Sequence, residues 1–295
     1  MSMELLLQHS TAFVNGIKMH YVEHGAGPAV VLLHGFPESW YAWRHQIPVL
    51  AEQFRVIVPD LRGYGASQKP AIGYDKKTMA RDIRELMLHL GVERAAIIGH
   101  DRGARVGLRF AKDFPEMTSC FAALDNIPTL TIFDRMNAAV ARTHWFFLFN
   151  AIRDLPEILI NGKEEAWLRH LFASWTHNPE VLTEEEISRY VETYRRPGSL
   201  RGAFEDYRAG EVDVEQDRVD HSRLIRMPTL ILWGEDFAAG GRLWDFREVW
   251  AEYAEHPRFV PIPRCGHLPH EEHPELVTAE LLKFLGAWKA EALGA

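Results

Sequence analysis

The chain has 295 residues, of which 47% are hydrophobic and 25% are charged, a balance typical of a globular protein and not of a disordered or fibrous one. Lysine and arginine number 33 against 41 aspartates and glutamates, which gives a formal net charge of -8. An acidic chain lacks the electrostatic footprint for nucleic acid or an anionic membrane, so neither is expected as a partner.

The two cysteines, Cys120 and Cys265, are too few for a disulfide scaffold. We interpret them as reduced thiols and expect a cytoplasmic protein. The first nine residues carry no basic region and only a short apolar run, which does not fit a signal peptide. No apolar run in the sequence approaches the roughly eighteen residues that a transmembrane helix needs, so no membrane span is expected.

The elements that follow along the chain are of two alternating kinds. Short apolar runs bounded by turn residues predict strands, and longer stretches with apolar residues at helical spacing predict helices. The predicted strands cover 30–33, 56–58, 95–98 and 121–124, and predicted helices cover 78–91 and 103–114. Continuous apolar strands that alternate with helices indicate an α/β fold, with a mostly parallel central sheet and helices on both faces.

This alternation stops after the fourth predicted strand. Residues 129–222 contain helical, aromatic-rich segments, including a capping box at 183–186 followed by an apolar stripe. Strand signals return at 229–233 and 259–262, before a final helix from about Pro274. We therefore predict a core domain of residues 1–128 and 223–295. The helical cap, 129–222, is inserted at the carboxyl ends of the strands, where open α/β sheets bind ligands.

The run Gly99-His100-Asp101-Arg102-Gly103 directly follows the strand predicted at 95–98. It has the form of a nucleophile elbow, Gly-x-Ser-x-Gly, with aspartate in place of serine. Its two glycines permit a sharp turn that raises the central side chain above the sheet. Asp101 could instead only cap the next helix. The motifs around it, an earlier His-Gly-Phe-Pro at 34–37 and a later Gly-His at 266–267, favour a nucleophile.

An aspartate nucleophile is ionised at neutral pH and needs no base to activate it. It suits displacement at a saturated carbon that bears a leaving group, and the product is an ester of the protein's own carboxylate. Hydrolysis of that ester needs an activated water and an oxyanion site. His267, after the last strand, is the candidate base. The backbone N–H groups of Phe36 and Arg102 are placed to form the oxyanion hole.

A third residue must orient His267, and the sequence offers two positions for it. Asp125 directly follows the strand at 121–124, whereas Asp236, next to Glu235, follows the strand at 229–233. In many proteins with such an elbow the acid stands three residues after the glycine of a Trp-Gly-x-x-Asp pattern, but here that position is Phe237. We favour Asp125 and keep Asp236 as the alternative, because loop register cannot be read from a sequence.

Together these motifs resemble the fluoroacetate dehalogenase (haloacetate dehalogenase) family of the α/β-hydrolase fold, from about His20 to Leu285. The most specific part is the run His-Asp-Arg-Gly-Ala-Arg at 100–105. The resemblance implies that Arg102 and Arg105 hold the substrate carboxylate, which agrees with the bidentate grip of arginine on carboxylates. It also strengthens the choice of Asp125 as the acid.

The resemblance further implies a halide site in the cap, formed by His144, Trp145 and Tyr207. From the residues alone, Trp145 would be assigned to core packing and His144 to a structural role. The activity implied is hydrolysis of short 2-haloacids, with fluoroacetate or another haloacetate giving glycolate and halide. Water is the co-substrate, and neither a cofactor nor a metal is expected. Because relatives of this kind are commonly homodimers, a homodimer is the assembly that the resemblance implies.

The main alternative is an epoxide hydrolase, which shares the aspartate, histidine and acid. That chemistry uses two cap tyrosines to protonate the epoxide oxygen, and here Tyr207 supplies one while Tyr190 and Tyr194 are better explained by packing. Epoxide hydrolases also usually carry tryptophan where this chain has Arg102. A haloalkane dehalogenase is disfavoured because a neutral substrate has no use for the two arginines beside the nucleophile.

Two readings from other classes are weaker. A binding protein on a hydrolase scaffold would not need the full set of Asp101, His267 and an acid. The cluster of histidines and glutamates at 267–273 lacks the His-Glu-x-x-His spacing of a zinc site, and Pro274 interrupts a helix there. We therefore interpret this cluster as a solvated loop.

Overall fold

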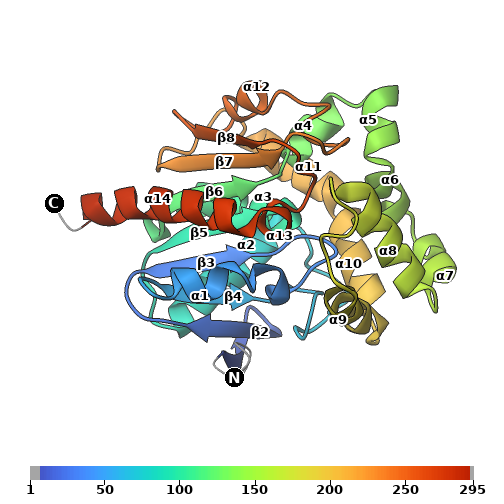
Figure 1. Ribbon diagram of the computed structural model, residues 1–295, viewed down its shortest axis with the longest axis horizontal. Helices are drawn as coiled ribbons and strands as arrows, with labels where there is room; N and C mark the ends of the chain where they lie inside the picture. The colour runs from blue at the N-terminus through green and yellow to red at the C-terminus, as the bar shows by residue number, and fades with distance from the viewer. Residues whose placement is uncertain (1–6, 293–295) are drawn as a thin grey trace.

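The computed structural model describes residues 7–292 and is built on one eight-stranded sheet (Figure 1). The neighbouring strands, in order across the sheet, are β1 (Gln8–Val14), β2 (Ile17–His24), β4 (Arg55–Pro59), β3 (Ala29–Leu33), β5 (Ala95–His100), β6 (Thr118–Leu124), β7 (Thr229–Gly234) and β8 (Arg258–Ile262). The strands β3 to β8 run parallel to one another, whereas β1 and β2 are antiparallel to their neighbours. The predicted α/β class is therefore confirmed, and all six predicted strands lie inside observed ones.

Helices cover both faces of this sheet (Figure 1). Alternate residues of each parallel strand point to opposite faces, so Val30 belongs to one buried cluster and Val31 to the other. On the face of Val30 lie α1 (Gln46–Leu50) and α14 (Pro274–Ala292). On the face of Val31 lie α2 (Lys76–His89), α3 (Asp101–Asp113) and α12 (Phe246–Trp250). Shorter turns are η2 (Trp40–Trp43), η3 (Pro115–Met117) and α13 (Pro269–Glu272).

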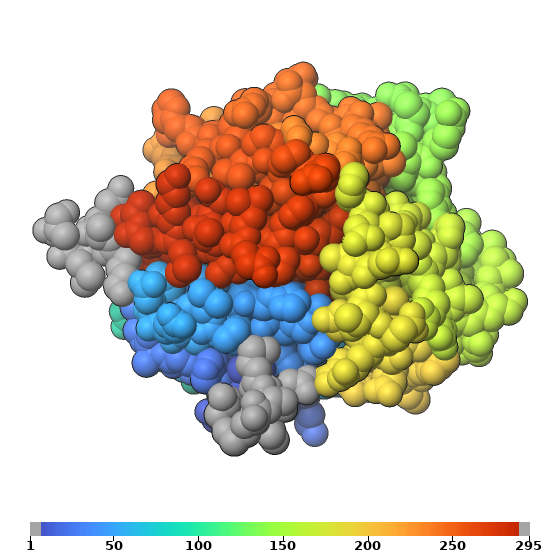
Figure 2. Space-filling view, viewed as in Figure 1, coloured from blue at the N-terminus to red at the C-terminus, as the bar shows by residue number. Residues whose placement is uncertain are grey.

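The segment between β6 and β7 consists of helices. They are α4 (Thr129–Asp134), α5 (Ala138–Thr143), α6 (Trp145–Ala151), α7 (Leu155–Ile160), α8 (Glu164–Trp175), α9 (Glu184–Arg195), α10 (Ser199–Arg208) and α11 (Gly210–Val219). In Figures 1 and 2, α6 to α10 form a lobe at one end of the sheet, packed against the core. The capping box predicted at 183–186 begins α9, and Tyr190 and Tyr194 on its stripe are buried. This arrangement fits the proposed cap.

Buried ion pairs fasten these helices to the sheet domain. Arg44, beside η2, reaches Glu186 of α9 at 2.6 Å. At the other side, Lys76 of α2 contacts both Asp206 of α10 and Asp213 of α11. Because breaking a buried pair leaves an uncompensated charge, these contacts hold the cap in a defined position over the strand ends.

Two further expectations concern the chain as a whole. Cys120 and Cys265 are buried and are not joined in a disulfide. Among the helices of residues 7–292, none has both the length and the apolar character needed to cross a bilayer.

Candidate active site

Asp101 stands on a sharp turn between β5 and α3, at the carboxyl end of the sheet. Its φ of 44° lies in the left-handed region, which a residue with a side chain occupies at a cost. The turn is possible because Gly103 passes against the preceding β3 chain: a Cβ there would lie 2.3 Å from the Leu33 carbonyl oxygen. The sequence thus builds the elbow that the motif predicts, and Asp101 is only 4% exposed at its tip.

His267 and Asp125 meet Asp101 at this point. Asp125 Oδ2 accepts a hydrogen bond from His267 Nδ1 at 2.5 Å, and Asp125 Oδ1 accepts from the Gly234 N–H at 3.1 Å. His267 Nε2 lies 3.8 Å from Asp101 Oδ2, which is outside hydrogen-bond range. The second nitrogen of His267 therefore remains available for a water beside the Asp101 carboxylate.

The competing acid, Asp236, lies away from His267. Its carboxylate contacts His177 at 2.7 Å and Arg242 at 3.1 Å, near the surface. The structure thus brings Asp125, and not Asp236, to the histidine. Asp125 also has a left-handed φ, 42°, so the ends of β5 and β6 both turn sharply to present a carboxylate.

Backbone and amide donors surround the nucleophile. The N–H of Phe36 donates to Asp101 Oδ1 at 3.1 Å, as expected for one half of an oxyanion hole. The N–H of Arg102, the other expected donor, makes no hydrogen bond to the Asp101 carboxylate in the described part of the chain. Asn126 Nδ2 donates to the Asp101 carbonyl oxygen at 3.0 Å and so steadies the elbow.

The surroundings of Asp101 and Asp125 shift the pKa values of these two carboxyl groups in opposite directions. Burial alone would raise the pKa of Asp101, but His267 and Arg105 outweigh burial and hold it below its ordinary value. Burial raises the pKa of Asp125 above its ordinary value in spite of the hydrogen bond from His267. Asp101 is therefore ionised at neutral pH, as the proposed role of nucleophile requires.

Behind His267 lies a buried network that the sequence analysis missed. The interpretation of residues 267–273 as a solvated loop is wrong, because His270 and Glu271 are buried and Pro269–Glu272 form α13. His100 Nε2 donates to the His267 carbonyl oxygen at 2.7 Å, and His100 Nδ1 contacts Glu38 Oε2 at 2.9 Å. Glu38 Oε1 lies 3.1 Å from His270 Nε2. Burial would lower the pKa of His100, but the Glu38 carboxylate raises it to about 9. The His100 imidazole is therefore positively charged at neutral pH, with both ring nitrogens protonated.

Glu38, His100 and His270 are also the one group in residues 7–292 whose atoms lie close enough to hold a metal ion. Glu38 is hydrogen-bonded to His100, whereas its contact with His270 is a close approach of 3.1 Å that does not meet hydrogen-bond geometry. The signal for this network in the sequence was the position of His100, directly before Asp101.

Arg102 does not reach the cavity as the resemblance implied. Its guanidinium is 1% exposed and grips Asp206 of α10, with Nη2 at 2.6 Å from Oδ1 and Nε at 3.0 Å from Oδ2. Its guanidinium carbon also lies 4.5 Å from the centre of the Tyr207 ring. The fork of Arg102 is thus occupied by an internal carboxylate, and it joins the elbow to the cap. No local motif signals this partner, because Asp206 lies far along the chain.

Arg105, in contrast, lines the cavity beside Asp101. Its guanidinium donates to the Thr129 hydroxyl at 2.7 Å, and its buried Nε has no hydrogen-bond partner. No acidic group forms an ion pair with it in the described residues. Burial, followed by the charge of Arg102, lowers the pKa of Arg105 to about 10, which leaves the guanidinium charged at neutral pH.

The three residues of the implied halide site are placed differently from one another. The Tyr207 hydroxyl is buried without a partner, and burial, followed by the charge of Asp101, raises its pKa well above the ordinary value. His144 lines the cavity. The Trp145 ring packs instead against Trp167 and Phe149, at centroid distances of 5.6 and 6.1 Å. His144 therefore lines the cavity. Tyr207 lies close enough to interact with the charge of Asp101 but does not line the cavity, and Trp145 packs elsewhere.

His144 is further limited by its own contacts. Burial, followed by the charge of Arg105, lowers its pKa to about 4, so the imidazole is neutral at neutral pH. Its Nδ1 lies 3.1 Å from the Thr143 hydroxyl, which can donate or accept, and 3.2 Å from the Val140 carbonyl oxygen, which can only accept. We therefore assign the single ring proton to Nδ1. In this tautomer Nε2 accepts a hydrogen bond, and the Tyr207 hydroxyl is the remaining donor for a leaving group.

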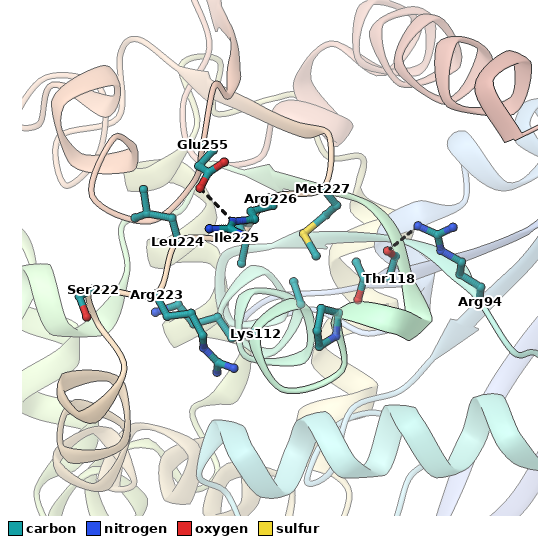
Figure 3. A pocket seen from close by; sticks show the side chains of 12 residues that line it. Arg94, Lys112, Thr118, Ser222, Arg223, Leu224, Ile225, Arg226, Met227 and Glu255 are labelled. Carbon is teal, nitrogen blue, oxygen red and sulfur yellow. Dashed lines mark hydrogen bonds and ion pairs between the residues drawn. The ribbon is translucent and has the colours of Figure 1, made fainter.

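The cavity at Asp101 is small and closed. All of its lining residues are buried, and its volume is about 20 Å³, which is little more than the space of one water. A larger hollow of about 690 Å³ lies at the opposite end of the strands, between Thr118 at the start of β6 and Met227 before β7 (Figure 3). It is too far from Asp101 to serve the same chemistry.

Comparison with known proteins agrees with this geometry. A family model described as alpha/beta hydrolase fold matches residues 28–274 of this chain. The chain is an α/β hydrolase. A soluble epoxide hydrolase of Corynebacterium sp. (strain C12) is 39% identical over 282 residues, which cover 94% of this chain and 97% of the relative. A fluoroacetate dehalogenase of Burkholderia sp. is 35% identical over 283 residues, covering 92% and 91%.

Comparison with solved structures also finds an epoxide hydrolase. Epoxide hydrolase CorEH without ligand has a TM-score of 0.90 and 38% identity, covering 95% of this α/β hydrolase and 99% of that chain. Because the similar proteins carry two different activities, membership of the family does not choose between them. That choice depends on the residues that line the cavity of this α/β hydrolase.

Two aromatic residues that the sequence analysis did not assign to the site also contact His267. The Phe237 ring is stacked on the imidazole at 4.4 Å, and Trp175 meets it edge-on at 5.3 Å. Phe237 stands where the Trp-Gly-x-x-Asp pattern would have placed the acid. That departure from the pattern was the available signal, and it pointed to the loop after β7.

Proposed function

We propose that this α/β hydrolase is a dehalogenase of short 2-haloacids, which it converts to the 2-hydroxyacid and halide. The observation that carries the proposal is Arg105, a charged guanidinium without an ion-pair partner in the described residues, in the wall of the cavity beside the nucleophile. A buried cation of this kind is stabilised by an anion, and a substrate carboxylate supplies one in bidentate form. With a neutral substrate the Asp101 carboxylate would be the main anion facing this charge, and Asp101 loses its own charge when it forms the ester.

The size of the site supports the same class. A cavity of about 20 Å³ holds little more than one water, so it must widen to admit any substrate, and the smallest substrates, such as haloacetates, require the least widening. Arg102 is held by Asp206, so in this proposal Arg105 alone binds the carboxylate, and Arg102 supports the site from behind. The fluoroacetate dehalogenase among the relatives, at 35% identity, acts as a precedent for the chemistry in this fold.

The reaction follows two balanced steps. A carboxylate oxygen of Asp101 attacks the α-carbon, the C–O bond forms as the carbon–halogen bond breaks, and the halide leaves with the bonding electron pair. The leaving halide accepts a hydrogen bond from the Tyr207 hydroxyl. The result is an ester between Asp101 and the 1-carboxyalkyl group, which is carboxymethyl for a haloacetate.

In the second step His267 Nε2 takes a proton from water, and the hydroxide attacks the ester carbonyl carbon of Asp101. The Phe36 N–H stabilises the negative oxygen of the tetrahedral intermediate. The bond between the Asp101 carbonyl carbon and the ester oxygen then breaks, and that oxygen leaves with the product. The product alkoxide takes the proton back from His267 and leaves as glycolate or its homologue. The second proton of the water, now on the Asp101 carboxyl group, is released to solvent, which regenerates the Asp101 carboxylate.

The preferred halogen follows from the donors at the leaving-group site. Fluoride loses the most hydration on leaving, so it needs several hydrogen bonds, each of about 1.5–3 kcal/mol to a charged acceptor. With Trp145 directed elsewhere and His144 in its accepting tautomer, Tyr207 is the one donor of the three. We therefore expect chloroacetate and bromoacetate to turn over faster than fluoroacetate.

A second candidate is epoxide hydrolysis, favoured by one observation. The Tyr207 hydroxyl is buried, protonated and near Asp101, which is the place of an acid that protonates an epoxide oxygen. The soluble epoxide hydrolase among the relatives, at 39% identity, shares most of its length with this chain. Asp101 would form the same kind of ester, and His267 would hydrolyse it.

The test compares the two activities directly. Halide release from chloroacetate, bromoacetate and fluoroacetate is measured beside diol formation from styrene oxide, with Asp101→Asn as the inactive control. Halide release that falls in Arg105→Met supports the dehalogenase. Diol formation without halide release, unchanged in Arg105→Met, contradicts it and favours the epoxide hydrolase.

A further inference from the structure

The loop after β7 carries an aromatic ring against the histidine of the site. Phe237 is 6% exposed, and its ring lies 4.4 Å from the His267 ring, centre to centre, with 28° between the two planes. It also lines the cavity. We infer that Phe237 is a positioning residue for the hydrolytic step, which holds the His267 imidazole in line with Asp125 and stabilises its protonated form.

The loop is folded so that Phe237 keeps this place. The Phe237 carbonyl oxygen accepts two backbone hydrogen bonds of 3.1 Å, from Gly240 and from Arg242. A side chain at Gly240 would press on the ring, because a Cβ there would lie 3.0 Å from Phe237 Cδ1. Gly240, which follows two alanines, therefore lets the turn close beneath the Phe237 ring.

The opposite contacts of His267 complete the clamp. Trp175 of α8 meets the imidazole edge-on, with an 86° angle, and its carbonyl oxygen accepts from the His267 N–H at 2.7 Å. With Asp125 at Nδ1 and Phe237 on one face, rotation of the imidazole is blocked on several sides. A histidine held in this way keeps Nε2 directed toward the carboxylate of Asp101.

The face of the ring also matters for charge. An aromatic face carries negative potential and attracts a cation that lies over it. In the second chemical step His267 takes the proton of water and is then positively charged. The charged groups around it are Asp125 at Nδ1, Asp101 near Nε2 and protonated His100, whose ring centre lies 4.8 Å away. Phe237 therefore favours the second chemical step, because the first step does not use the histidine.

The position also explains why an acid is absent there. The Asp125 oxygens lie 3.4 Å from the place of a Cβ on Gly240, so this loop packs directly against that carboxylate. A second buried carboxylate at position 237 would face Asp125 with like charge, which disfavours the ionised form of both. With the acid on β6, an apolar ring is the compatible choice.

The inference deepens the proposed function and depends on its ester route, so one arm of the test uses no substrate. In the resting protein, the proton between His267 Nδ1 and Asp125 in a 2.5 Å hydrogen bond is followed as a low-field proton NMR signal. We expect Phe237→Leu to broaden or remove this signal and Phe237→Tyr, which keeps the ring, to retain it. Phe246→Leu is the matched control, because Phe246 lines the same cavity but stacks on Trp233.

The second arm separates the two chemical steps in a single turnover with chloroacetate, or with styrene oxide if only the epoxide turns over. The mass of the Asp101 peptide reports ester formation and decay. Phe237→Leu should form the ester at the wild-type rate and hydrolyse it about tenfold more slowly, so the ester accumulates. Phe237→Tyr should restore the hydrolysis rate.

Each combined result of the two arms either supports or overturns the inference. Loss of the NMR signal with selective slowing of hydrolysis in Phe237→Leu, but not in Phe246→Leu, supports the inference. A wild-type signal and hydrolysis rate in Phe237→Leu, or equal changes in Phe246→Leu, overturns it. If the wild type releases neither halide nor diol, the proposed function fails, and the NMR arm still decides whether Phe237 positions His267.

Discussion

The side of the cavity that belongs to the sheet and the side that belongs to the cap are held by different interactions. On the sheet side, Asp101, Asp125 and His267 stand at strand ends, in left-handed turns or on short hydrogen bonds. On the cap side, Tyr207 is held by rings and by the guanidinium of Arg102, and its hydroxyl has no partner.

The difference teaches where chemistry and specificity reside. Reacting groups need fixed geometry, and strand ends with hydrogen-bonded side chains provide it. The cap side presents one donor, one neutral acceptor and aromatic walls, which can change without disturbing the reacting groups. Relatives with two different activities on one fold are expected from such a division.

The largest expected effect lies on the sheet side. Asp125→Asn removes the acceptor that fixes the tautomer of His267, so ester hydrolysis should slow by about 10⁴-fold, while ester formation by Asp101 continues. Stopped-flow halide release with a burst of one equivalent, followed by almost no turnover, is the expected record. A variant that turns over normally would show that Asp236 or another group orients the histidine.

The next prediction concerns the buried pair behind His267. The pKa of His100 is raised to about 9 in the folded protein, above its ordinary 6.5. Its contribution to the free energy of unfolding is therefore present below about pH 6.5 and is lost as the pH rises through 9. The difference in unfolding free energy between the wild type and His100→Gln should shrink by about 3 kcal/mol from pH 6 to pH 10.

Denaturant titrations at several pH values measure this difference, and a pH-independent gap would contradict the proposed charge on His100. The comparison with Asp125→Asn is informative, because both residues contact His267 from the sheet side. We expect His100 to affect stability with pH and Asp125 to affect the chemical step.

The two arginines of α3 give the sharpest contrast between the regions. Arg105→Met should raise the KM for chloroacetate by about 100-fold, since a charge-assisted bond to the carboxylate is lost. Its thermal stability should hold or increase, because an uncompensated buried charge is removed. Arg102→Met should instead lower the unfolding free energy by about 3 kcal/mol, because the buried Asp206 loses one of its two cationic partners and keeps Lys76. Reversed effects would mean that Arg102 leaves Asp206 when substrate binds.

The smallest effect is expected at Trp145. Its ring packs against Trp167 and Phe149 outside the cavity, so Trp145→Phe should change the rate of halide release by less than about threefold. Halide assays with chloroacetate and fluoroacetate check this. A loss of a hundredfold or more, greatest for fluoroacetate, would return Trp145 to the halide site that the resemblance implied.

Most of the sheet could be predicted because its signals are local. Apolar runs such as 95–98 and 229–233 fall inside β5 and β7. The hairpin of β1 and β2 was not predicted, although its Asn15-Gly16 turn, with positive φ at both residues, is a strong hairpin signal. The exposed positions of β1 weaken its apolar pattern, which explains the omission.

The candidate reacting residues could be placed from the sequence because Asp101 and Asp125 each follow a strand directly and His267 lies in the segment after the last strand. Partners across the cap could not. The ion pair of Arg102 with Asp206 joins residues more than one hundred positions apart, and the direction of the Trp145 ring depends on α8. The network of Glu38 with His100 similarly needs the β3 loop to return beneath the elbow.

The contact between Arg102 and Asp206 has a consequence for recombining these proteins. Arg102 belongs to the elbow and Asp206 to the cap, and Lys76 and Tyr64 of the core also bind the Asp206 carboxylate. A cap transplanted from a relative without an acid at this position would leave Arg102 and Lys76 as buried cations without the Asp206 carboxylate. Chimaeras should therefore exchange these four residues as one unit, which makes the boundary of the cap electrostatic as well as topological.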